Sequence, residues 1–450
     1  MPELPEVETV KNKISPYIVG KTIRDIKTFY SKYAVLDCIK NEKINSIERR
    51  GKYLIFILDD YYMISHLRME GKYFIKENPI KEKHDLVFFE FDGFTLIYND
   101  VRKFGMFYLF DKKTDIYSIE PLSKVGKEPF DMKKEELYSL LHNKKEHIKT
   151  LLLDQSIISG LGNIYVDEVL FKSRLNPLKE GKDITLGDCE SIIKYSIETL
   201  NDAIKNGGST IRSFESFNGE TGHFQSHLLV HSREMERCKV CGNIIQKIKV
   251  NGRGTYYCPT CQNDGKKVYA ITGTIASGKS TVLSYLNSLG YKTYSTDEIY
   301  SNLFTSNKKM QKEILSSFNT LDKEKIKEAI SNDPEMNNKL MDITHKYVMS
   351  ELWKMIDSDN SEVVFVEVPL LFEGGYEKTF TSTIDIYQNN KVEEVLYNIR
   401  GIDKVKQKAF LSLQLSKDDK KTLSEYIIYN NGTINDLKKE TDKLLKKLEV

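Results

Sequence analysis

Two closely spaced cysteine pairs near the middle of the chain constrain its fold more than any other feature. They are Cys238-x2-Cys241 and Cys258-x2-Cys261, and sixteen residues separate them. Each pair can form a tight turn that directs both thiolates to one ion, and the stretch between them can form a hairpin that brings the pairs face to face. This spacing predicts a zinc ribbon holding one structural Zn²⁺, closed because four thiolates leave no position for water. Four buried free thiols are the alternative.

The two remaining cysteines, Cys38 and Cys189, stand alone, so the pattern favours metal ligands in a reducing compartment over a disulfide framework. We expect a cytoplasmic protein, because the acidic amino terminus MPELPEVETV lacks the apolar core of a secretory signal. The longest apolar runs, such as residues 53–58 and 363–372, are too short to span a bilayer, so no membrane partner is expected.

Composition is that of a globular chain, with 40% hydrophobic and 29% charged residues. Lys and Arg number 67 against 65 Asp and Glu, which gives a net charge of only +2. Bulk charge therefore does not indicate a nucleic-acid partner, and any DNA-binding surface must arise from local clustering of basic side chains.

The hydrophobic patterning changes along the 450 residues, which exceed one ordinary core. Residues 20–110 alternate β-rich runs with polar breaks, which predicts an antiparallel sandwich or barrel. Residues 131–205 carry leucine and isoleucine at helical spacing. After the polar stretch 262–267, strands alternate with helices, which predicts a parallel α/β sheet. We expect a multidomain protein with a β-sandwich at 1–128, a helical domain at 129–231, the ribbon at 232–264 and an α/β domain at 268–450.

The α/β domain opens with a phosphate-binding motif. Residues 273–280 fit G-x4-G-K-[ST] and lie between the strand VYAIT and the helix STVLSYLNSL. Lys279 would reach the β- and γ-phosphates, and Ser280 would ligate Mg²⁺. The motif predicts nucleotide binding by Gly273, Thr274, Ile275, Ala276, Ser277, Gly278, Lys279, Ser280 and Thr281.

The amino terminus offers a nucleophile. Removal of the initiator Met exposes Pro2 as a secondary amine, which can attack an electrophilic carbon and form an iminium. The reference pKa of an α-amino group is about 7.7–8, so a useful fraction is unprotonated at neutral pH. Glu3 is a candidate acid–base group beside it, and Glu6 is near enough in sequence to support it.

The segment PELPEVETV resembles the opening of the formamidopyrimidine-DNA glycosylases, and the resemblance continues to Cys261. It implies that Pro2 attacks C1′ of a damaged nucleotide in double-stranded DNA, that Glu3 is the general acid, and that β,δ-elimination cuts the strand. Lys52, in RRGKYLIF, matches the family's hairpin lysine. The resemblance makes the helical domain a helix–two-turn–helix DNA-binding domain.

The resemblance also assigns DNA contacts. A flipped base leaves a gap that planar and apolar side chains fill. Met69 in HLRMEG matches the void-filling methionine, while Arg102 and Phe104 in NDVRKFG match the residues that probe the orphaned base. Asn163 in GLGNIYVDE and Arg253 in GRGTYYC match phosphate ligands. On their own, Met69 and Phe104 could be ordinary core residues.

The loop at 207–224 resembles the family's lid over the flipped base. Two positions depart from the family pattern: Val101 replaces a proline and Lys103 an arginine, and lysine lacks the bidentate fork. The PELPEVE opening favours oxidised purines, such as 8-oxoguanine and formamidopyrimidines, as substrates.

The second half resembles dephospho-coenzyme A kinase through TGTIASGKSTV, YSTDEIY, FVEVPLLFEGGYEKTF and YNNGTINDL. This resemblance implies transfer of the ATP γ-phosphoryl group to the 3′-hydroxyl of dephospho-CoA, with Mg²⁺. Asp297 matches the catalytic base and Arg400 a lid arginine. A helix amino-cap is the alternative for Asp297.

Several positions depart from the kinase pattern: Ser295 and Glu367 replace aspartates, Lys346 follows His345 where the family has proline, and Phe410 replaces a second lid arginine. We therefore expect a working but weak kinase. The alternatives are an active glycosylase with a nucleotide-binding but weak or inactive kinase domain, a DNA-binding scaffold whose P-loop domain is a nucleotide sensor, a kinase for another metabolite, and, ranked last, an ATP-driven DNA enzyme.

Overall fold

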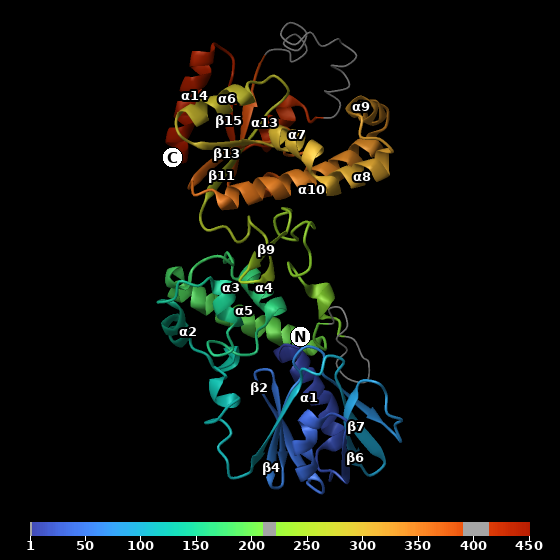
Figure 1. The fold of residues 1–450 in the computed structure, drawn as a ribbon. Coiled ribbons are helices and arrows are strands. Elements are labelled where there is room, and N and C mark those ends of the chain that lie inside the picture. The colour runs from blue at the N-terminus through green and yellow to red at the C-terminus, as the bar shows by residue number, and fades with distance from the viewer. Residues whose placement is uncertain (1, 210–221, 390–413) are drawn as a thin grey trace. The chain divides into compact units, whose positions relative to one another are not determined.

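The computed structural model describes residues 2–209, 222–389 and 414–450 (Figure 1). The chain forms two compact units. The first comprises Met1–His231 with Ile248–Thr255, and the second comprises Ser232–Lys247 with Tyr256–Val450. The polar stretch 262–267 therefore lies inside the second unit, and the four paired cysteines belong to that unit as well.

The first unit begins with helix α1 and a sandwich of two antiparallel sheets, as the alternating pattern predicted. One sheet has the strand order β2-β3-β4-β8 and the other β1-β6-β7-β5. Buried apolar side chains of α1, such as Val10 and Ile14, pack in one core with Leu54 and Phe56 of β3. The elements are α1 (Leu4–Ile18), β1 (Asp25–Thr28), η1 (Ser31–Ile39), β2 (Ile44–Arg50), β3 (Tyr53–Leu58), β4 (Tyr61–His66), β5 (Lys72–Lys76), β6 (Asp85–Phe91), β7 (Phe94–Asn99) and β8 (Met106–Asp111).

A helical layer follows in the same unit and has its own apolar core. Leu4 of α1 belongs to this second core, so the first helix contributes to both. Helix α5 starts at a capping box in which the hydroxyl of Thr185 accepts from the amide of Asp188. The elements are η2 (Leu122–Lys124), η3 (Pro129–Asp131), α2 (Lys134–Leu141), α3 (Ile148–Leu153), α4 (Asn163–Lys172), η4 (Gly181–Asp183), α5 (Leu186–Lys205) and η5 (Phe224–His227).

The second unit contains a five-stranded parallel sheet in the order β12-β13-β11-β14-β15, which confirms the predicted α/β fold. Alternate residues of β11 enter different cores: Val268 packs with α7 and α10, whereas Tyr269 packs with α6 and α14. Helices therefore cover both faces of the sheet. The elements are β11 (Lys267–Thr272), α6 (Lys279–Ser288), β12 (Lys292–Ser295), α7 (Thr296–Ser306), α8 (Lys308–Phe318), α9 (Lys323–Asn332), α10 (Pro334–Ser358), β13 (Val363–Glu367), η6 (Glu377–Thr379), β14 (Ser382–Tyr387), α13 (Lys417–Leu423), β15 (Tyr426–Tyr429) and α14 (Ile434–Leu448).

The predicted ribbon contains the hairpin of β9 (Gln246–Val250) and β10 (Arg253–Tyr257). The cysteine pairs lie on either side of this hairpin, as the spacing predicted. Across the described ranges, no helix is long and apolar enough to cross a membrane.

A buried ion network joins α3 to α4 in the first unit. The Lys149 ammonium donates to the Asp167 carboxylate at 2.6 Å, and both side chains are fully buried. The other Asp167 oxygen lies 2.7 Å from Nδ1 of His231. Lys149 also donates to the backbone carbonyl of Asn163 at 3.1 Å, so the network fixes the first turn of α4.

We expect Lys149→Met to destabilise α3 and α4 by about 3 kcal/mol, because a buried carboxylate loses its cation while the methylene stem is retained. Lys127→Met is the matched control, because Lys127 pairs with Glu136 at an exposed site worth roughly 0–1 kcal/mol. Amide hydrogen exchange of the two helices, measured in the full chain, reports both values. Equal protection in the two variants would contradict the expected role of the network.

Candidate active sites and zinc site

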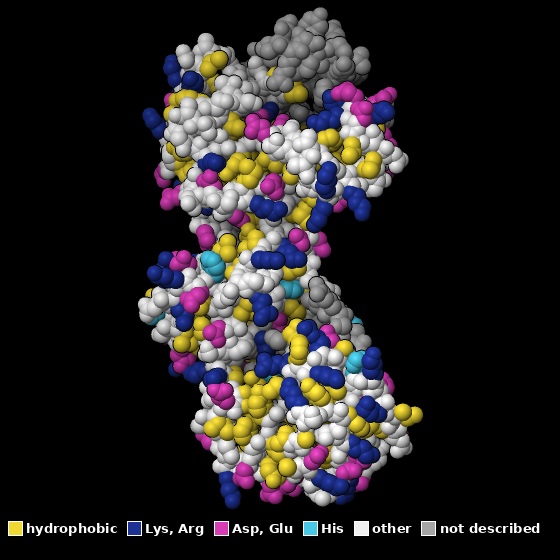
Figure 2. All heavy atoms as spheres, in the orientation of Figure 1, with side chains coloured by type: hydrophobic (Ala, Val, Ile, Leu, Met, Phe, Trp, Pro, Cys, Tyr) yellow, Lys and Arg dark blue, Asp and Glu magenta, His cyan; other side chains and the backbone are white. Residues whose placement is uncertain are grey.

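A cavity of about 650 Å³ lies in the first unit where the amino terminus meets the helical layer. It gathers every glycosylase residue singled out in the sequence except Phe104: Pro2, Glu3, Glu6, Lys52, Met69, Arg102, Asn163 and Arg253. Arg68 and Lys124 also line it. Figure 2 shows dark-blue Lys and Arg side chains gathered around the hollow between the β-sandwich and the helical layer. The basic surface is therefore local, as the near-neutral composition required.

The Glu3 carboxylate is held at the amino end of α4. It accepts hydrogen bonds from the backbone amides of Ile164 at 3.0 Å and Tyr165 at 3.5 Å, and Glu3 is almost fully buried. The free amides and the helix dipole favour a negative charge at this point. Gly162 makes the approach possible, since a Cβ there would lie 2.3 Å from the carboxyl carbon of Glu3. Glu3 is thereby fixed one residue from Pro2.

The Glu6 carboxylate holds the backbone of the amino terminus in place. It accepts from the backbone amide of Glu3 at 2.8 Å, from the hydroxyl of Tyr165 at 2.6 Å and from the amide of Ser209 at 2.7 Å. Burial, and next the charge of Glu3, raise the pKa of Glu6. Glu6 therefore orients the backbone at Glu3, and Ser209 and Tyr165 are supports that the sequence did not indicate.

Lys52 enters the cavity from the turn that precedes β3. Its ammonium donates to the carbonyl of Leu161 at 2.6 Å and is buried. Burial lowers the pKa of Lys52, while the carboxylates of Glu3 and Glu6 act in the opposite direction. The carbonyl of Leu161 precedes the turn at Gly162, so Lys52 and Glu3 are both tied to the same turn.

The predicted gap-filling side chains are exposed at the cavity edge. Met69 is 37% exposed and Phe104 is 51% exposed, which excludes the ordinary core role that was their alternative. The Arg102 guanidinium lies 4.8 Å from the centre of the Phe104 ring. Lys103 adopts a left-handed backbone with φ of 57°. Exposed apolar groups beside a basic cavity suit insertion into a base stack.

The hairpin of β9 and β10 brings Arg253 close to Asn163. The Asn163 side-chain amide donates to the carbonyl of Gly254 at 3.0 Å, so its nitrogen holds the hairpin. Arg253, the residue before Gly254, lines the cavity and is exposed. The predicted phosphate-binding role of both residues stays a prediction.

The four paired cysteines form one buried cluster. All their Sγ atoms lie within 4.8 Å of one another. The Cys238–Cys261 sulfurs are 3.8 Å apart and the Cys241–Cys258 sulfurs 3.4 Å apart. A tetrahedral ion with Zn–S bonds of about 2.3 Å requires sulfur separations of about 3.8 Å. The cluster therefore fits a structural Zn²⁺, as predicted.

The phosphate-binding loop has the backbone that its motif requires. Gly273, with φ of 145°, passes so close to its neighbours that a Cβ would lie 2.6 Å from the Ser277 hydroxyl. Gly278, with φ of 105°, starts α6. The Lys279 ammonium donates to the carbonyls of Gly273 at 3.1 Å and Thr274 at 2.9 Å. Burial lowers the pKa of Lys279 to about 8. This cradle fits the phosphates of ATP.

Ser295 and Glu367, two positions that depart from the kinase pattern, lie side by side at the carboxyl ends of β12 and β13. The Ser280 hydroxyl lies 3.4 Å and 3.5 Å from the Glu367 carboxylate oxygens, an arrangement of hard oxygen donors that suits Mg²⁺. Ser295 is the residue before α7, and Asp297 lies in its first turn, so Asp297 is not the helix cap. Burial raises the pKa of Asp297, partly offset by the charge of Lys279. Arg400 and Phe410 lie outside the described residues.

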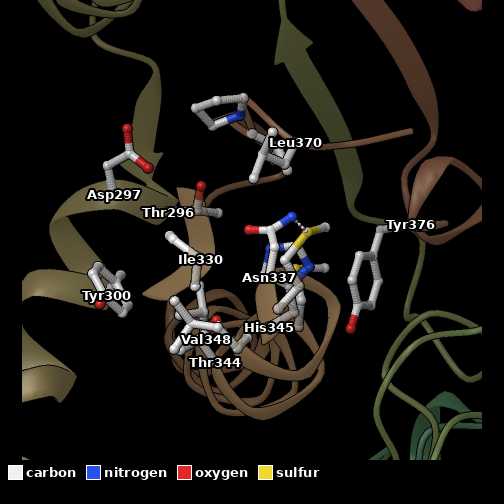
Figure 3. Close-up of a pocket in the computed structure, with 15 residues that line it drawn as sticks. Thr296, Asp297, Tyr300, Ile330, Asn337, Thr344, His345, Val348, Leu370 and Tyr376 are labelled. Atoms are coloured by element: carbon white, nitrogen blue, oxygen red, sulfur yellow. Dashed lines mark hydrogen bonds between the residues drawn. The ribbon is translucent and has the colours of Figure 1, made fainter. Parts of the chain in front are cut away.

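Asp297 also lies at the edge of a cavity of about 270 Å³, lined mainly by apolar side chains of α10 and of the segment after β13 (Figure 3). His345 and Tyr376 face each other there, with ring centres 5.9 Å apart. Burial, and next the charge of Arg237, lower the pKa of His345 to about 4. Lys346 points elsewhere, to Glu313 of α8.

The sequence reasoning missed several residues near the phosphate loop. Asp385, within β14, is buried beside Gly273, and burial raises its pKa to about 6. Asn430 donates to the carbonyl of Ser277 at 2.8 Å. Lys420 donates to the carbonyl of Pro369 at 2.6 Å. Asn430 belongs to the quoted segment YNNGTINDL and could have been found there, whereas no signal marked Asp385 or Lys420.

Comparison with known proteins agrees with this division of the chain. Four family models match: the formamidopyrimidine-DNA glycosylase N-terminal domain over residues 1–107, its H2TH domain over 124–215, the zinc finger found in FPG and IleRS over 236–263, and dephospho-CoA kinase over 267–436. The formamidopyrimidine-DNA glycosylase of Exiguobacterium sibiricum is 48% identical over 274 residues, covering 58% of this chain and 99% of that protein. The Bacillus cereus protein of the same name is 44% identical over 275 residues, with the same coverage.

The chain belongs to the formamidopyrimidine-DNA glycosylase family. Solved structures of Lactococcus lactis Fpg resemble its first 58% and are covered completely. The complex with abasic-site DNA has a TM-score of 0.55 at 41% identity, and the complex with N7-benzyl-Fapy-dG DNA has 0.54 at 42%. The remainder is a dephospho-CoA kinase domain, so the chain is a fusion, as predicted.

We expect the full chain to bind one zinc ion, and Cys241→Ser to lose it, because a hydroxyl is a far poorer zinc ligand than a thiolate. Cys38→Ser is the matched control, since Cys38 is exposed and lies outside the cluster. Elemental analysis of the purified chains measures the metal content. Zinc retained at full occupancy by Cys241→Ser, or absent from the unaltered chain, would contradict the assignment.

Proposed function

We propose that this chain is a bifunctional enzyme: a DNA glycosylase and AP lyase acting on oxidised purines, fused to an ATP-dependent kinase for dephospho-CoA. One observation carries the first activity. Pro2, Glu3 and Lys52 converge on a single basic cavity, at the amino terminus of a chain that belongs to the glycosylase family. The exposed Met69 and Phe104 at its edge support action on a flipped base.

The proposed reaction uses the free amine of Pro2. Its nitrogen attacks C1′ of the damaged nucleotide as the bond from C1′ to the base breaks, and the base leaves with the electron pair and takes up the proton that the amine releases. Glu3 then protonates O4′ as the C1′–O4′ bond breaks, which opens the sugar ring and leaves an iminium between Pro2 and C1′. The resulting iminium makes the C2′ hydrogen acidic, so successive β- and δ-elimination break the 3′ and 5′ carbon–oxygen bonds. Lys52, buried in the same cavity and attracted by the carboxylates of Glu3 and Glu6, supplies positive charge on the DNA side.

On the DNA side, we propose that Arg253 and Asn163 contact phosphates and that Arg102, Phe104 and Met69 occupy the gap left by the flipped base. Sequence-independent phosphate contacts fix the register, and the inserted side chains keep the base out of the stack. The family's usual preference, formamidopyrimidines and 8-oxoguanine, is proposed here as the substrate class. The cysteine usage supports a cytoplasmic location.

Borohydride trapping on a duplex containing 8-oxoguanine tests the first activity. We expect the unaltered chain to form a covalent adduct with the DNA, and Pro2→Gly or a chain extended before Pro2 to lose at least about tenfold in trapping rate, because the secondary amine is changed or blocked. Pro79→Ala is the control, since that proline lies outside the cavity. Failure to trap the unaltered chain, or undiminished trapping by the extended chain, would refute the mechanism.

For the second half, we propose that Gly273–Thr281 of the phosphate loop and Lys279 hold ATP, that Ser280 with Glu367 holds Mg²⁺, and that Asp297 accepts the proton of the acceptor hydroxyl. The shape of the apolar cavity beside Asp297 supports a small-molecule acceptor rather than a nucleotide sensor. A carboxylate with a pKa raised by burial is a better base toward a hydroxyl. Arg400 is proposed to stabilise the transferring phosphoryl group.

A coupled assay of ADP release tests the kinase. We expect slow but measurable turnover with dephospho-CoA, and at least about a hundredfold loss in Asp297→Asn with little change in ATP affinity, because proton acceptance is lost and the phosphate loop is intact. Asp322→Asn is the matched control, as Asp322 caps α9. Tight ATP binding without turnover of dephospho-CoA would overturn this activity and favour the nucleotide sensor, or a kinase for another metabolite if a different acceptor is phosphorylated.

A further inference from the structure

The zinc ribbon contributes directly to the core of the second unit. Ile244, between the cysteine pairs, is buried in the same apolar cluster as Leu352 of α10 and Val366 of β13. The Ser350 hydroxyl donates to Gln246 Oε1 at 3.1 Å, and the Gln246 side-chain amide donates to the backbone carbonyl of Ser350 at 3.2 Å. Both ribbon residues lie between the two cysteine pairs, so the ribbon is packed against the kinase fold and not merely linked to it.

Two ribbon residues reach the segment that follows β13. The Arg237 guanidinium donates to the carbonyl of Gly374 at 3.0 Å, and lies 4.6 Å from the centre of the Tyr376 ring. Thr260, inside the second cysteine pair, donates to the carbonyl of Thr379 at 3.1 Å. The ribbon therefore holds residues 374–379 at both ends.

The held segment forms one wall of the apolar cavity beside Asp297. Tyr376 lines that cavity and is almost fully buried. Gly374 is packed so tightly that a Cβ would lie 2.7 Å from the Tyr376 ring and 2.9 Å from His345 Nδ1. Gly375 turns the chain with φ of 68°. Within the segment, the Thr379 hydroxyl donates to the carbonyl of Tyr376 at 2.7 Å, whereas Arg237 is the ribbon side chain that contacts both the Gly374 carbonyl and the Tyr376 ring.

We propose that Arg237 of the zinc ribbon is a positioning residue for the kinase acceptor site, holding Gly374 and Tyr376 in the wall of the cavity that receives the acceptor. A cation–π contact with a buried ring and a charge-assisted hydrogen bond together favour one arrangement of the turn. Because Arg237 directly precedes Cys238, the cysteine cluster fixes its backbone. A part of the glycosylase half thus shapes the kinase pocket. This inference rests on the proposed kinase function.

The test compares Arg237→Ala with Lys247→Ala in the full zinc-loaded chain. Lys247 is a ribbon cation whose ion pair with Glu234 does not touch the kinase fold. We expect Arg237→Ala to raise KM for dephospho-CoA about three- to thirtyfold with KM for ATP within twofold, since only the acceptor wall is loosened. Lys247→Ala should leave both values unchanged, and Arg237→Lys, which keeps a cation near the ring, should restore part of the loss.

Amide hydrogen exchange of residues 370–378 provides a readout that does not need turnover. We expect faster exchange there in Arg237→Ala than in Lys247→Ala, with equal zinc content in both. Unchanged exchange would overturn the proposal, as would a parallel rise of both KM values, which would indicate a general defect. If exchange accelerates but the unaltered chain shows no turnover with dephospho-CoA, the positioning of the turn stands and the assigned kinase activity fails.

Discussion

The contact on which the glycosylase half depends is the Glu3 carboxylate at the amino end of α4. A buried carboxylate needs hydrogen-bond donors, and the first turn of a helix offers amides that have no partner within the helix. Glu3 meets the amides of Ile164 and Tyr165, so the second and third residues of the chain are placed by an element 160 residues later. The Lys149 network then fixes that element, because Lys149 also holds the Asn163 carbonyl.

In the kinase half, the phosphate-binding loop is shaped by its backbone: positive φ angles at two glycines set the path of the chain. Gly273 and Gly278 adopt positive φ angles that bend the loop, and the buried Lys279 ammonium donates hydrogen bonds to the carbonyls of Gly273 and Thr274. These carbonyls satisfy the ammonium group. Phosphate oxygens would offer Lys279 stronger partners, and the release of the loop carbonyls would accompany binding.

Much of this arrangement could be predicted from sequence, for identifiable reasons. The cysteine spacing, the phosphate loop and the β-rich runs are local patterns, and each one restricts structure within about thirty residues. The exposed amino terminus indicated Pro2 and Glu3, and resemblance to known families gave them their roles and added Lys52 and Asp297. The alternation of Val268 and Tyr269 between two cores follows from the strand period, so the layered fold was also accessible.

Contacts between distant segments could not be predicted in this way. Gly162 looks like any loop glycine until Glu3 is seen 2.3 Å from its missing Cβ, and nothing near Asp385 marks it as a neighbour of the phosphate loop. Arg237 is the clearest example of such a contact. Its neighbour Cys238 identifies it with the ribbon, whereas its side chain serves the kinase segment at Gly374 and Tyr376. The sequence placed the ribbon at 232–264 and the α/β domain at 268–450, yet Ile244 of the ribbon lies in the kinase core. Burial of apolar side chains such as Ile244 favours packing of the ribbon against the kinase fold over separation of the two.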